Sequence, residues 1–156
     1  MDYLPVFLGI RGQPCLVVGG GEVALRKVNS LMRAGAKISV VSPSLVEGLL
    51  ALALEGQIQH VEKPFEVADL GDSILVVSAT NDPVVNKEVY EAALLRRIPV
   101  NVVDCPELCS FIFPAIVDRS PLVIAVSTGG ASPVLARAVR ARLELLFPKA
   151  YGMLAT

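Results

Sequence analysis

Three consecutive glycines at residues 19–21 constrain the fold of this 156-residue chain more than any other feature. They follow four apolar residues, 15–18, and precede residues 22–34, in which apolar side chains recur at helical spacing. Gly35 supplies the expected end of that helix. A short apolar strand that turns through glycines into a helix is typical of the first unit of a dinucleotide-binding fold.

The segment from Gly19 to Ala24 matches the pattern G-x-G-x-x-A. Gly19 permits the tight turn, Gly21 lets a pyrophosphate approach the backbone, and Ala24 allows the helix to pack closely on the strand. The start of the helix adds free N–H groups and a partial positive charge. The motif predicts dinucleotide binding; the alternative is a tight turn in a related fold that has lost its ligand.

Strands and helices alternate through the next part of the chain. Further strands are predicted at residues 37–41, 58–61, 73–78 and 99–103, with helices at 44–55 and 83–97. Ser44 and Glu47 fit a capping box for the first of these helices. Asn81 or Asp82 fits the N-cap of the second, followed by a proline. The connections are too long for hairpins, so we expect an α/β fold with a Rossmann-type parallel sheet.

The pattern changes after Asp104. Apolar runs at residues 110–117 and 122–127 are separated by only four residues, which predicts an antiparallel hairpin. Ser132 begins a last helix, which Pro148 ends near Phe147. We therefore expect an NAD-binding Rossmann domain at 1–112, followed by a small antiparallel hairpin-plus-helix region at 113–156.

Composition excludes several classes of function. Fourteen basic and fifteen acidic residues give a net charge of −1, which argues against nucleic-acid binding. Mean hydropathy is high, +0.60, yet no run of about 18 uncharged apolar residues predicts a membrane helix. A parallel sheet covered on both faces, or a large oligomer interface, accounts for the excess. No signal peptide is evident and the three cysteines are an odd number, so we expect a cytoplasmic protein with free thiols.

Polar residues follow the predicted strands at their carboxyl ends, where ligands bind in such folds. Thr80 and Asn81 follow the fourth strand and are predicted to border the cofactor, although Asn81 or Asp82 could simply cap the next helix. Asp104 follows the fifth strand, where a carboxylate could accept a proton or ligate a metal, or else cap a loop.

The acid that usually binds the ribose after the second strand is missing, since this position falls at residues 42–44. The choice between NAD and NADP therefore stays open. Arg26 and Lys27 could favour a phosphate, but a solvated helix face is the better interpretation. Cys105 and Cys109 make a poor zinc site. His60 is interpreted as structural, far from the carboxyl ends of the strands.

A second glycine cluster lies between the last strand and the last helix. Its hydroxyls, its flexible backbone and the helix N-terminus predict an anion site, with a solvated basic helix face as the alternative. The predicted substrate-binding residues are Thr128, Gly129, Gly130, Ser132, Arg119 and Arg137.

The segments LPVFLGIRGQPCLVVGGGEVALRK, ATND and NVVDCPELCSFIFPAIVDRSPLVIAVSTGGASPVLAR carry a family resemblance. From residue 2 to about residue 148 the chain resembles the N-terminal module of sirohaem synthases and their stand-alone relatives. These are precorrin-2 dehydrogenases, many of which are also sirohydrochlorin ferrochelatases. Family members continue into a helical domain that helps roof the tetrapyrrole site. The resemblance does not extend into that domain, so we expect either a fragment of a longer protein or a minimal member.

The resemblance implies that NAD+ accepts a hydride as precorrin-2 becomes sirohydrochlorin, and that chelating members insert Fe2+ in the same crevice. It places the family's general base, also a transient metal ligand, on Asp104. It implies a homodimer formed through the hairpin region, in which Thr128 aligns with a serine that some members phosphorylate. It places the cofactor-binding residues on Gly19, Gly21, Glu22, Val23, Ala24, Pro43 and Ser44.

Two other functions fit parts of this sequence. A nucleotide-sensing regulatory module without chemistry would explain the glycine motif and a dimer, but gives no reason for Asp104 beside a Gly-Gly anion loop. The second alternative is an oxidoreductase for another polyanionic substrate.

Overall fold

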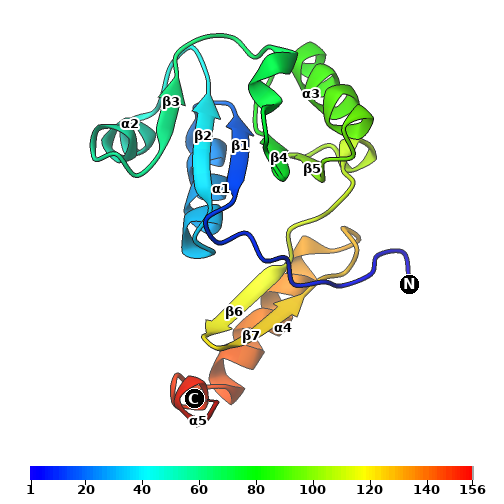
Figure 1. The fold of residues 1–156 in the computed structure, drawn as a ribbon. Coiled ribbons are helices and arrows are strands. Elements are labelled where there is room, and N and C mark those ends of the chain that lie inside the picture. The colour runs from blue at the N-terminus through cyan, green and yellow to red at the C-terminus, as the bar shows by residue number, and fades with distance from the viewer. Residues whose placement is uncertain (156) are drawn as a thin grey trace. The chain divides into compact units, whose positions relative to one another are not determined.

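The computed structural model describes residues 1–155 and divides into two compact units. The first, here called the sheet unit, comprises Val6–Phe111. The second, the hairpin unit, comprises Met1–Pro5 together with the residues from Ile112 onward (Figure 1). The grouping of the first five residues with the end of the chain was not predicted.

Five parallel strands form the sheet unit's core, in the order β3-β2-β1-β4-β5. Their bounds are β1 (Pro14–Val18), β2 (Lys37–Val41), β3 (Gln59–Val61), β4 (Leu75–Ser78) and β5 (Val100–Val102). Val18 pairs with Val41 on one side and with Ser78 on the other, so the carboxyl ends of β1, β2 and β4 finish together. The strand order reverses beside β1, where Rossmann folds bind their ligands. The predicted parallel sheet is confirmed.

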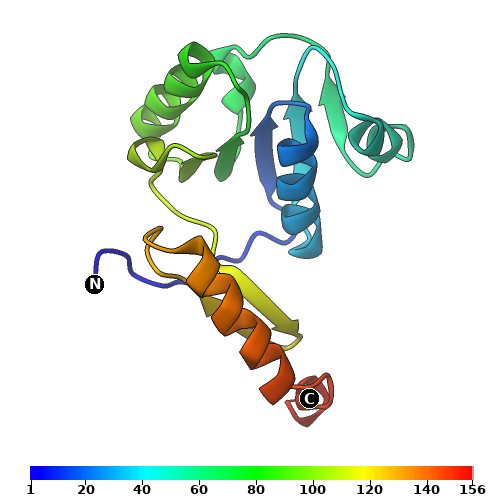
Figure 2. The same cartoon turned by 180° about the vertical axis from the view of Figure 1, so that it is seen from behind.

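Helices cover the sheet because consecutive parallel strands need crossover connections. The helical elements are α1 (Glu22–Arg33), α2 (Glu47–Leu54), α3 (Pro83–Leu95) and the 3₁₀ turns η1 (Val67–Leu70) and η2 (Pro106–Leu108). Helix α1 packs on β1 and β2, and α3 packs on β4 and β5 (Figure 2). The strand side chains between them are almost wholly buried, as continuous apolar runs require.

The predicted capping box at Ser44 is wrong. Helix α2 begins at Glu47 with Val46 as its N-cap, and no side chain caps it. The backbone N–H of Val46 instead donates to the carbonyl of Gly20 at 2.8 Å. A tertiary hydrogen bond to the glycine loop therefore sets where this helix starts.

The hairpin unit consists of β6 (Ala115–Arg119) and β7 (Leu122–Val126), paired antiparallel, with α4 (Pro133–Leu146) and α5 (Ala150–Leu154). Helix α4 packs against both strands. Its N-cap is Ser132, as predicted, whose hydroxyl accepts the N–H of Leu135 at 3.2 Å. The short α5 after Pro148 was not predicted. None of the helices within residues 1–155 is long and apolar enough to span a membrane.

The strand predicted at 110–117 begins five residues later than expected, at Ala115. Its first residues instead run along the free edge of β5. The hydroxyl of Ser110 accepts the N–H of Val100 at 2.9 Å, and the Ser110 N–H donates to the Val100 carbonyl at 2.8 Å. The side-chain amide of Asn101 donates to the Phe111 carbonyl at 3.0 Å. These bonds cover an otherwise unpaired sheet edge.

Candidate nucleotide-binding and catalytic site

Gly19 occupies a position that only glycine fits. Its φ of +122° lies in a region that other residues rarely adopt. A Cβ atom there would lie 2.4 Å from the carbonyl oxygen of Ala79, at the end of β4. The Gly19 N–H donates to the Val41 carbonyl at 3.0 Å. The turn after β1 is therefore in close contact with the ends of both neighbouring strands.

Gly20, which the motif treats as variable, is equally constrained. A Cβ atom would lie 1.9 Å from the carbonyl oxygen of Ser44 and 2.6 Å from the hydroxyl of Ser42. The loop after β2 thus rests directly on the glycine backbone, and the Val46 N–H bond fastens it there. Sequence reasoning missed this residue because its constraint comes from a loop about 25 residues away.

Gly21 differs from both, since no heavy atom lies within 4 Å of the position its Cβ would take. It is the N-cap of α1 and offers no side chain to the first-turn N–H groups. Those groups, including the N–H of Glu22 and Val23, have no acceptor within the helix. Ala24 is fully buried beneath them. Open space beside a free helix N-terminus fits a pyrophosphate.

Two hydrogen-bonding contacts support the loop after β2. The hydroxyl of Ser42 donates to the Ser44 carbonyl at 2.7 Å, and Nε2 of His60 lies 2.9 Å from the Ser42 carbonyl. His60 was expected far from the carboxyl ends of the strands, and that expectation is wrong. Pro43 and Ser44 are exposed above this support. No acid lies between Ser42 and Val46, so a ribose there would meet hydroxyl and backbone groups.

The loop after β4 contains Thr80, which is half-buried, and Asn81, which is exposed. Asp82 is the N-cap of α3, with its carboxylate accepting the N–H of Val84 at 2.9 Å. The capping role therefore falls to Asp82, and Asn81 stays a predicted cofactor contact. The Thr80 hydroxyl bonds within its own loop and to Asn86 of α3 at 2.9 Å.

Asp104 lies just beyond β5 with its side chain exposed. Its φ is +60°, a left-handed conformation that aspartate tolerates better than most residues. This backbone turn reverses the chain into η2 and leaves the carboxylate outside the strand end. The geometry suits a group that must reach a ligand rather than pack.

Lys27 of α1 is half-buried, so its interpretation as part of a solvated helix face is wrong; neighbouring Arg26 is exposed as expected. Burial lowers the pKa of Lys27, and the charge of Arg26 lowers it further. The charges of Asp104 and Cys109 act in the opposite direction and raise it. The Lys27 ammonium therefore lies within electrostatic range of the Asp104 carboxylate, a relation that the sequence did not suggest.

Cys105 and Cys109 each form hydrogen bonds within the protein. Cys109 accepts the N–H of Val102 and donates to the Val102 carbonyl, both at 3.2 Å, and burial is the main cause that raises its pKa. Cys105 donates to the carboxylate of Glu107 at 3.2 Å. Within residues 1–155, no three His, Cys, Asp or Glu side chains gather as a metal site would require.

The second glycine cluster lies in the hairpin unit. Gly129 and Gly130 have φ values of +65° and +87°, and the hydroxyl of Thr128 accepts the N–H of Ser132 at 2.9 Å. Since Ser132 in turn caps α4, both hydroxyls already serve the local turn. Their predicted contact with a substrate stays a prediction.

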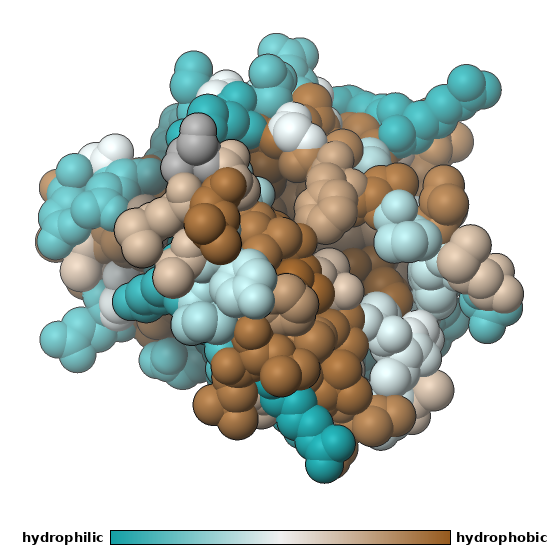
Figure 3. Space-filling view, turned by 90° about the horizontal axis from the view of Figure 1, so that it is seen from below, coloured by the Kyte–Doolittle hydropathy of each residue, from teal (hydrophilic) through white to brown (hydrophobic). Residues whose placement is uncertain are grey.

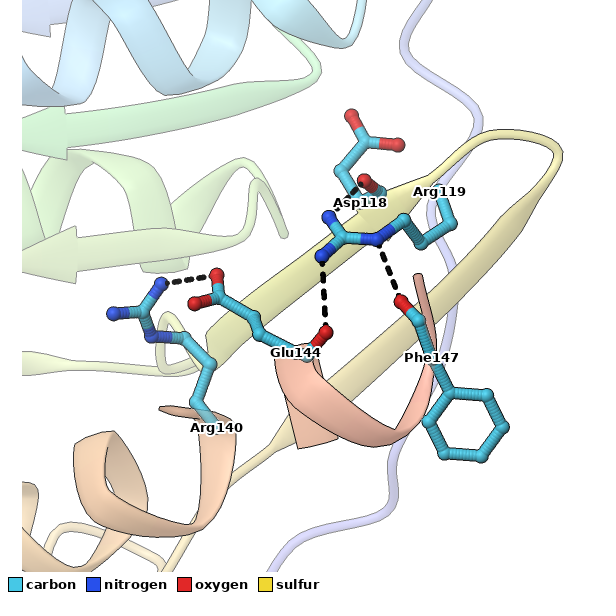
Figure 4. A network of polar contacts seen from close by, with 5 residues as sticks. All are labelled: Asp118, Arg119, Arg140, Glu144 and Phe147. Carbon is cyan, nitrogen blue, oxygen red and sulfur yellow. Dashed lines mark hydrogen bonds and ion pairs between the residues drawn. The ribbon is translucent and has the colours of Figure 1, made fainter. Parts of the chain in front are cut away.

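Arg119 of β6 holds the end of α4 (Figure 4). Its guanidinium donates to the carbonyls of Phe147 at 2.7 Å and Glu144 at 3.4 Å. Cations at a helix C-terminus satisfy carbonyls that lack intrahelical partners. Arg140 pairs with the Glu144 carboxylate at 2.8 Å, whereas Arg137 is exposed. Arg119 thus has a structural role, and its substrate role, like that of Arg137, stays a prediction.

The sheet and its glycine loop define a Rossmann-type dinucleotide-binding protein. Residues 6–115 match a family described as "Putative NAD(P)-binding", and residues 119–145 match one described as "Sirohaem biosynthesis protein central".

Curated relatives cover the whole chain. The sirohaem synthases of Methylobacillus flagellatus and Nitrosomonas europaea are each 56% identical to it, over 99% of this chain and 33% of theirs. The chain therefore spans about a third of the length of these relatives. Among solved structures, SirC, a precorrin-2 dehydrogenase, superposes with a TM-score of 0.83 at 30% identity, covering 97% of this chain and 74% of that one. The chain belongs to the NAD(P)-binding family of sirohaem biosynthesis.

Proposed function

We propose that this chain is a module that oxidises precorrin-2 to sirohydrochlorin with NAD+. One observation carries the proposal: the sheet unit places a free helix N-terminus and an exposed carboxylate, Asp104, after strands of one parallel sheet. Membership of the family and the likeness to SirC support the choice of substrate. An unligated tight turn would not need open space at Gly21.

The proposed nucleotide site uses backbone groups for the charged part of the cofactor. The N–H groups of Glu22 and Val23 would bind the pyrophosphate, and Pro43 and Ser44 would border the ribose. Thr80 and Asn81 would border the cofactor from the end of β4. When bound, NAD+ would supply the hydride acceptor.

The proposed oxidation removes two hydrogen atoms from precorrin-2. One C–H bond breaks with its electron pair, and that hydride leaves for the nicotinamide. A second hydrogen leaves as a proton, and the electron pair of the bond that it leaves forms the new double bond of the macrocycle. The Asp104 carboxylate would accept this proton, and its exposure allows it to pass the proton on to water.

Insertion of Fe2+ into sirohydrochlorin is the second proposed reaction. The macrocycle supplies the nitrogen ligands of the product, so the protein needs no resident metal cluster. It needs a base for the displaced protons and a transient oxygen ligand for the arriving ion. Asp104 would provide both at the end of β5.

We also propose a cytoplasmic homodimer that forms through the hairpin unit. The hairpin unit has two strands packed against α4 and α5, and it leaves many of its apolar side chains exposed. Apolar side chains cover much of the face drawn in Figure 3. The hairpin unit exposes Leu4, Ile116, Val134, Leu135, Leu145, Leu146, Met153 and Leu154. Such exposed apolar surface marks an interaction site. Cys15, Cys105 and Cys109 are all free, which suits a reducing compartment.

The test is NADH formation from precorrin-2 under anaerobic conditions, with wild-type chain and with Asp104→Asn. Asparagine also tolerates the left-handed backbone of residue 104, so the substitution removes the base without straining the turn. We expect kcat to fall by about 10²- to 10⁴-fold while NAD+ affinity is unchanged. NAD+ binding without turnover in the wild-type chain would mean either that turnover needs the family's helical domain or that the chain is a nucleotide-sensing module; turnover restored by that domain would separate the two. Full turnover in the variant would remove Asp104 from the mechanism.

A further inference from the structure

Asn86, in the first turn of α3, joins three groups at the end of β4. Its side-chain oxygen accepts the hydroxyl of Ser78 at 2.8 Å and the hydroxyl of Thr80 at 2.9 Å. Its side-chain nitrogen donates to the Thr80 carbonyl at 3.1 Å. One amide therefore fixes the last residue of β4 and both the side chain and backbone of the loop that follows.

The chemistry at this point demands a carboxamide. Ser78 is fully buried, so its hydroxyl needs an acceptor inside the protein. Both hydroxyls donate to a single oxygen that has two lone pairs, while the carbonyl of Thr80 requires a donor. Asparagine supplies this combination. Aspartate would keep the acceptor but bring a second, charged oxygen toward the Thr80 carbonyl.

The loop that Asn86 holds is in contact with the nucleotide turn. Ala79, between the two residues bonded to Asn86, has its carbonyl against Gly19, where a Cβ would lie 2.4 Å away. The Ala79 N–H also donates to the Val18 carbonyl at 2.7 Å. A shift of the Ala79–Thr80 peptide would therefore displace the turn after β1. This turn has its other side fixed by the Ser42–Val46 loop.

The hydrogen bonds to Asn86 also limit which groups of Thr80 can contact a ligand. Its single hydroxyl proton points between the Asn86 side-chain oxygen at 2.9 Å and the Asp82 carbonyl at 3.2 Å, and its oxygen accepts the N–H of Asp82 at 3.1 Å. Thr80 therefore has no hydroxyl proton left to donate to a ligand.

We propose that Asn86 is a positioning residue of the nucleotide site: it holds the Ala79–Thr80 peptide against Gly19 and so fixes the turn that receives the pyrophosphate. Asn86 itself contacts no cofactor. The inference rests on the proposed nucleotide site, and it assigns part of the affinity for the dinucleotide to a residue on α3, outside the glycine motif.

The experiment measures NAD+ affinity by titration calorimetry for the chain and its Asn86→Ala and Asn86→Asp variants. We expect both variants to bind NAD+ at least about tenfold more weakly. The reason is that loss of the hydrogen bonds that hold the loop changes a dissociation constant by about this factor. Amide hydrogen exchange of the nucleotide-free variants provides a second measurement. We expect faster exchange at Asp82, whose N–H is held by the Thr80 hydroxyl.

Val89→Ala is the matched control, because Val89 lies three residues further along α3 and is fully buried in the core. This substitution should lower Tm without weakening NAD+ binding, which separates positioning from general destabilisation. Equal NAD+ affinity in wild type and Asn86→Ala would overturn the inference alone. Absence of NAD+ binding by the wild-type chain would overturn the proposed nucleotide site and the inference with it.

Discussion

The two units of this chain bury their apolar residues to different extents. The sheet unit encloses a continuous core in which Leu16, Val17, Val40, Val76 and Val100 are at most 1% exposed. In the hairpin unit, Val117 and Ala136 are the buried apolar side chains among the described residues, while several leucines face solvent. The sheet unit ends at Phe111, after η2, where the side-chain amide of Asn101 on β5 donates to the Phe111 carbonyl.

This difference separates two tasks. A nucleotide turn that is in contact with the ends of both neighbouring strands needs a rigid frame, and a parallel sheet buried on both faces provides one. The hairpin unit has two strands and two helices but leaves many apolar side chains exposed, so a second copy is expected to cover them. We therefore expect nucleotide binding in the sheet unit, whose core is closed within one chain. We expect assembly through the hairpin unit, whose apolar surface is not covered within one chain.

The largest effect on stability is expected in the sheet unit, from Gly20→Ala. The new methyl group would lie 1.9 Å from the Ser44 carbonyl, a backbone atom that cannot rotate away. We expect a loss of about 3 kcal/mol in the free energy of unfolding, measured by urea denaturation.

Gly21→Asp is the matched variant, since position 21 has open space and serves as the N-cap of α1. Aspartate is a good N-cap, so stability should hold or rise slightly while NAD+ binding is lost to the added charge. Equal destabilisation by both substitutions would contradict the account of this turn.

The next effect concerns assembly. Ile116→Glu and Leu145→Glu place charges on the exposed apolar surface of the hairpin unit. We expect each to raise the dimer dissociation constant about a hundredfold, as burial of an unpaired charge costs about 3 kcal/mol or more. Sedimentation equilibrium measures this change.

Leu95→Glu is the control, because Leu95 is 87% exposed on α3 of the sheet unit. It should leave the dissociation constant unchanged. A wild-type chain that sediments as a monomer, or dissociation caused by Leu95→Glu alone, would remove the dimer from the hairpin unit.

The smallest effect is a pH dependence in the sheet core. Cys15 is 1% exposed, and burial raises the pKa of its thiol to about 11. The folded state then holds a proton that the unfolded state releases near pH 9, so stability is full below that pH and falls as pH rises toward 11. Relative to Cys15→Ala, the wild-type chain should lose about 2 kcal/mol between these limits, measured by denaturation at each pH. Parallel curves for the two proteins would show that Cys15 titrates normally.

Much of the sheet unit was predictable because its signals are local. Apolar runs such as residues 37–41, the glycines that end α1 and α2, and the proline after Asp82 each specify structure within a few residues. Gly19 and Ala24 follow from the same logic. Asp104 was predictable as a polar residue just past a strand.

What sequence reasoning missed depends on contacts between distant segments. Ser44 has the right spacing for a cap, but the bond from Val46 to Gly20 decides where α2 begins. Ser110 is in an apolar run that looks like a strand, yet its hydroxyl covers the edge of β5. Lys27 and Asn86 resemble surface helix residues in the sequence. In the fold, Lys27 lies within electrostatic range of Asp104, and Asn86 bonds to Ser78 at the end of β4.

The most direct test of this account is amide hydrogen exchange across the chain with and without NAD+. The account predicts protection in the sheet unit at residues 19–24, 42–46 and 79–82, with no change in the glycine cluster at 127–132 of the hairpin unit. Protection confined to residues 127–132, or none in the sheet unit at saturating NAD+, would contradict the claim that the sheet unit forms the nucleotide site by itself.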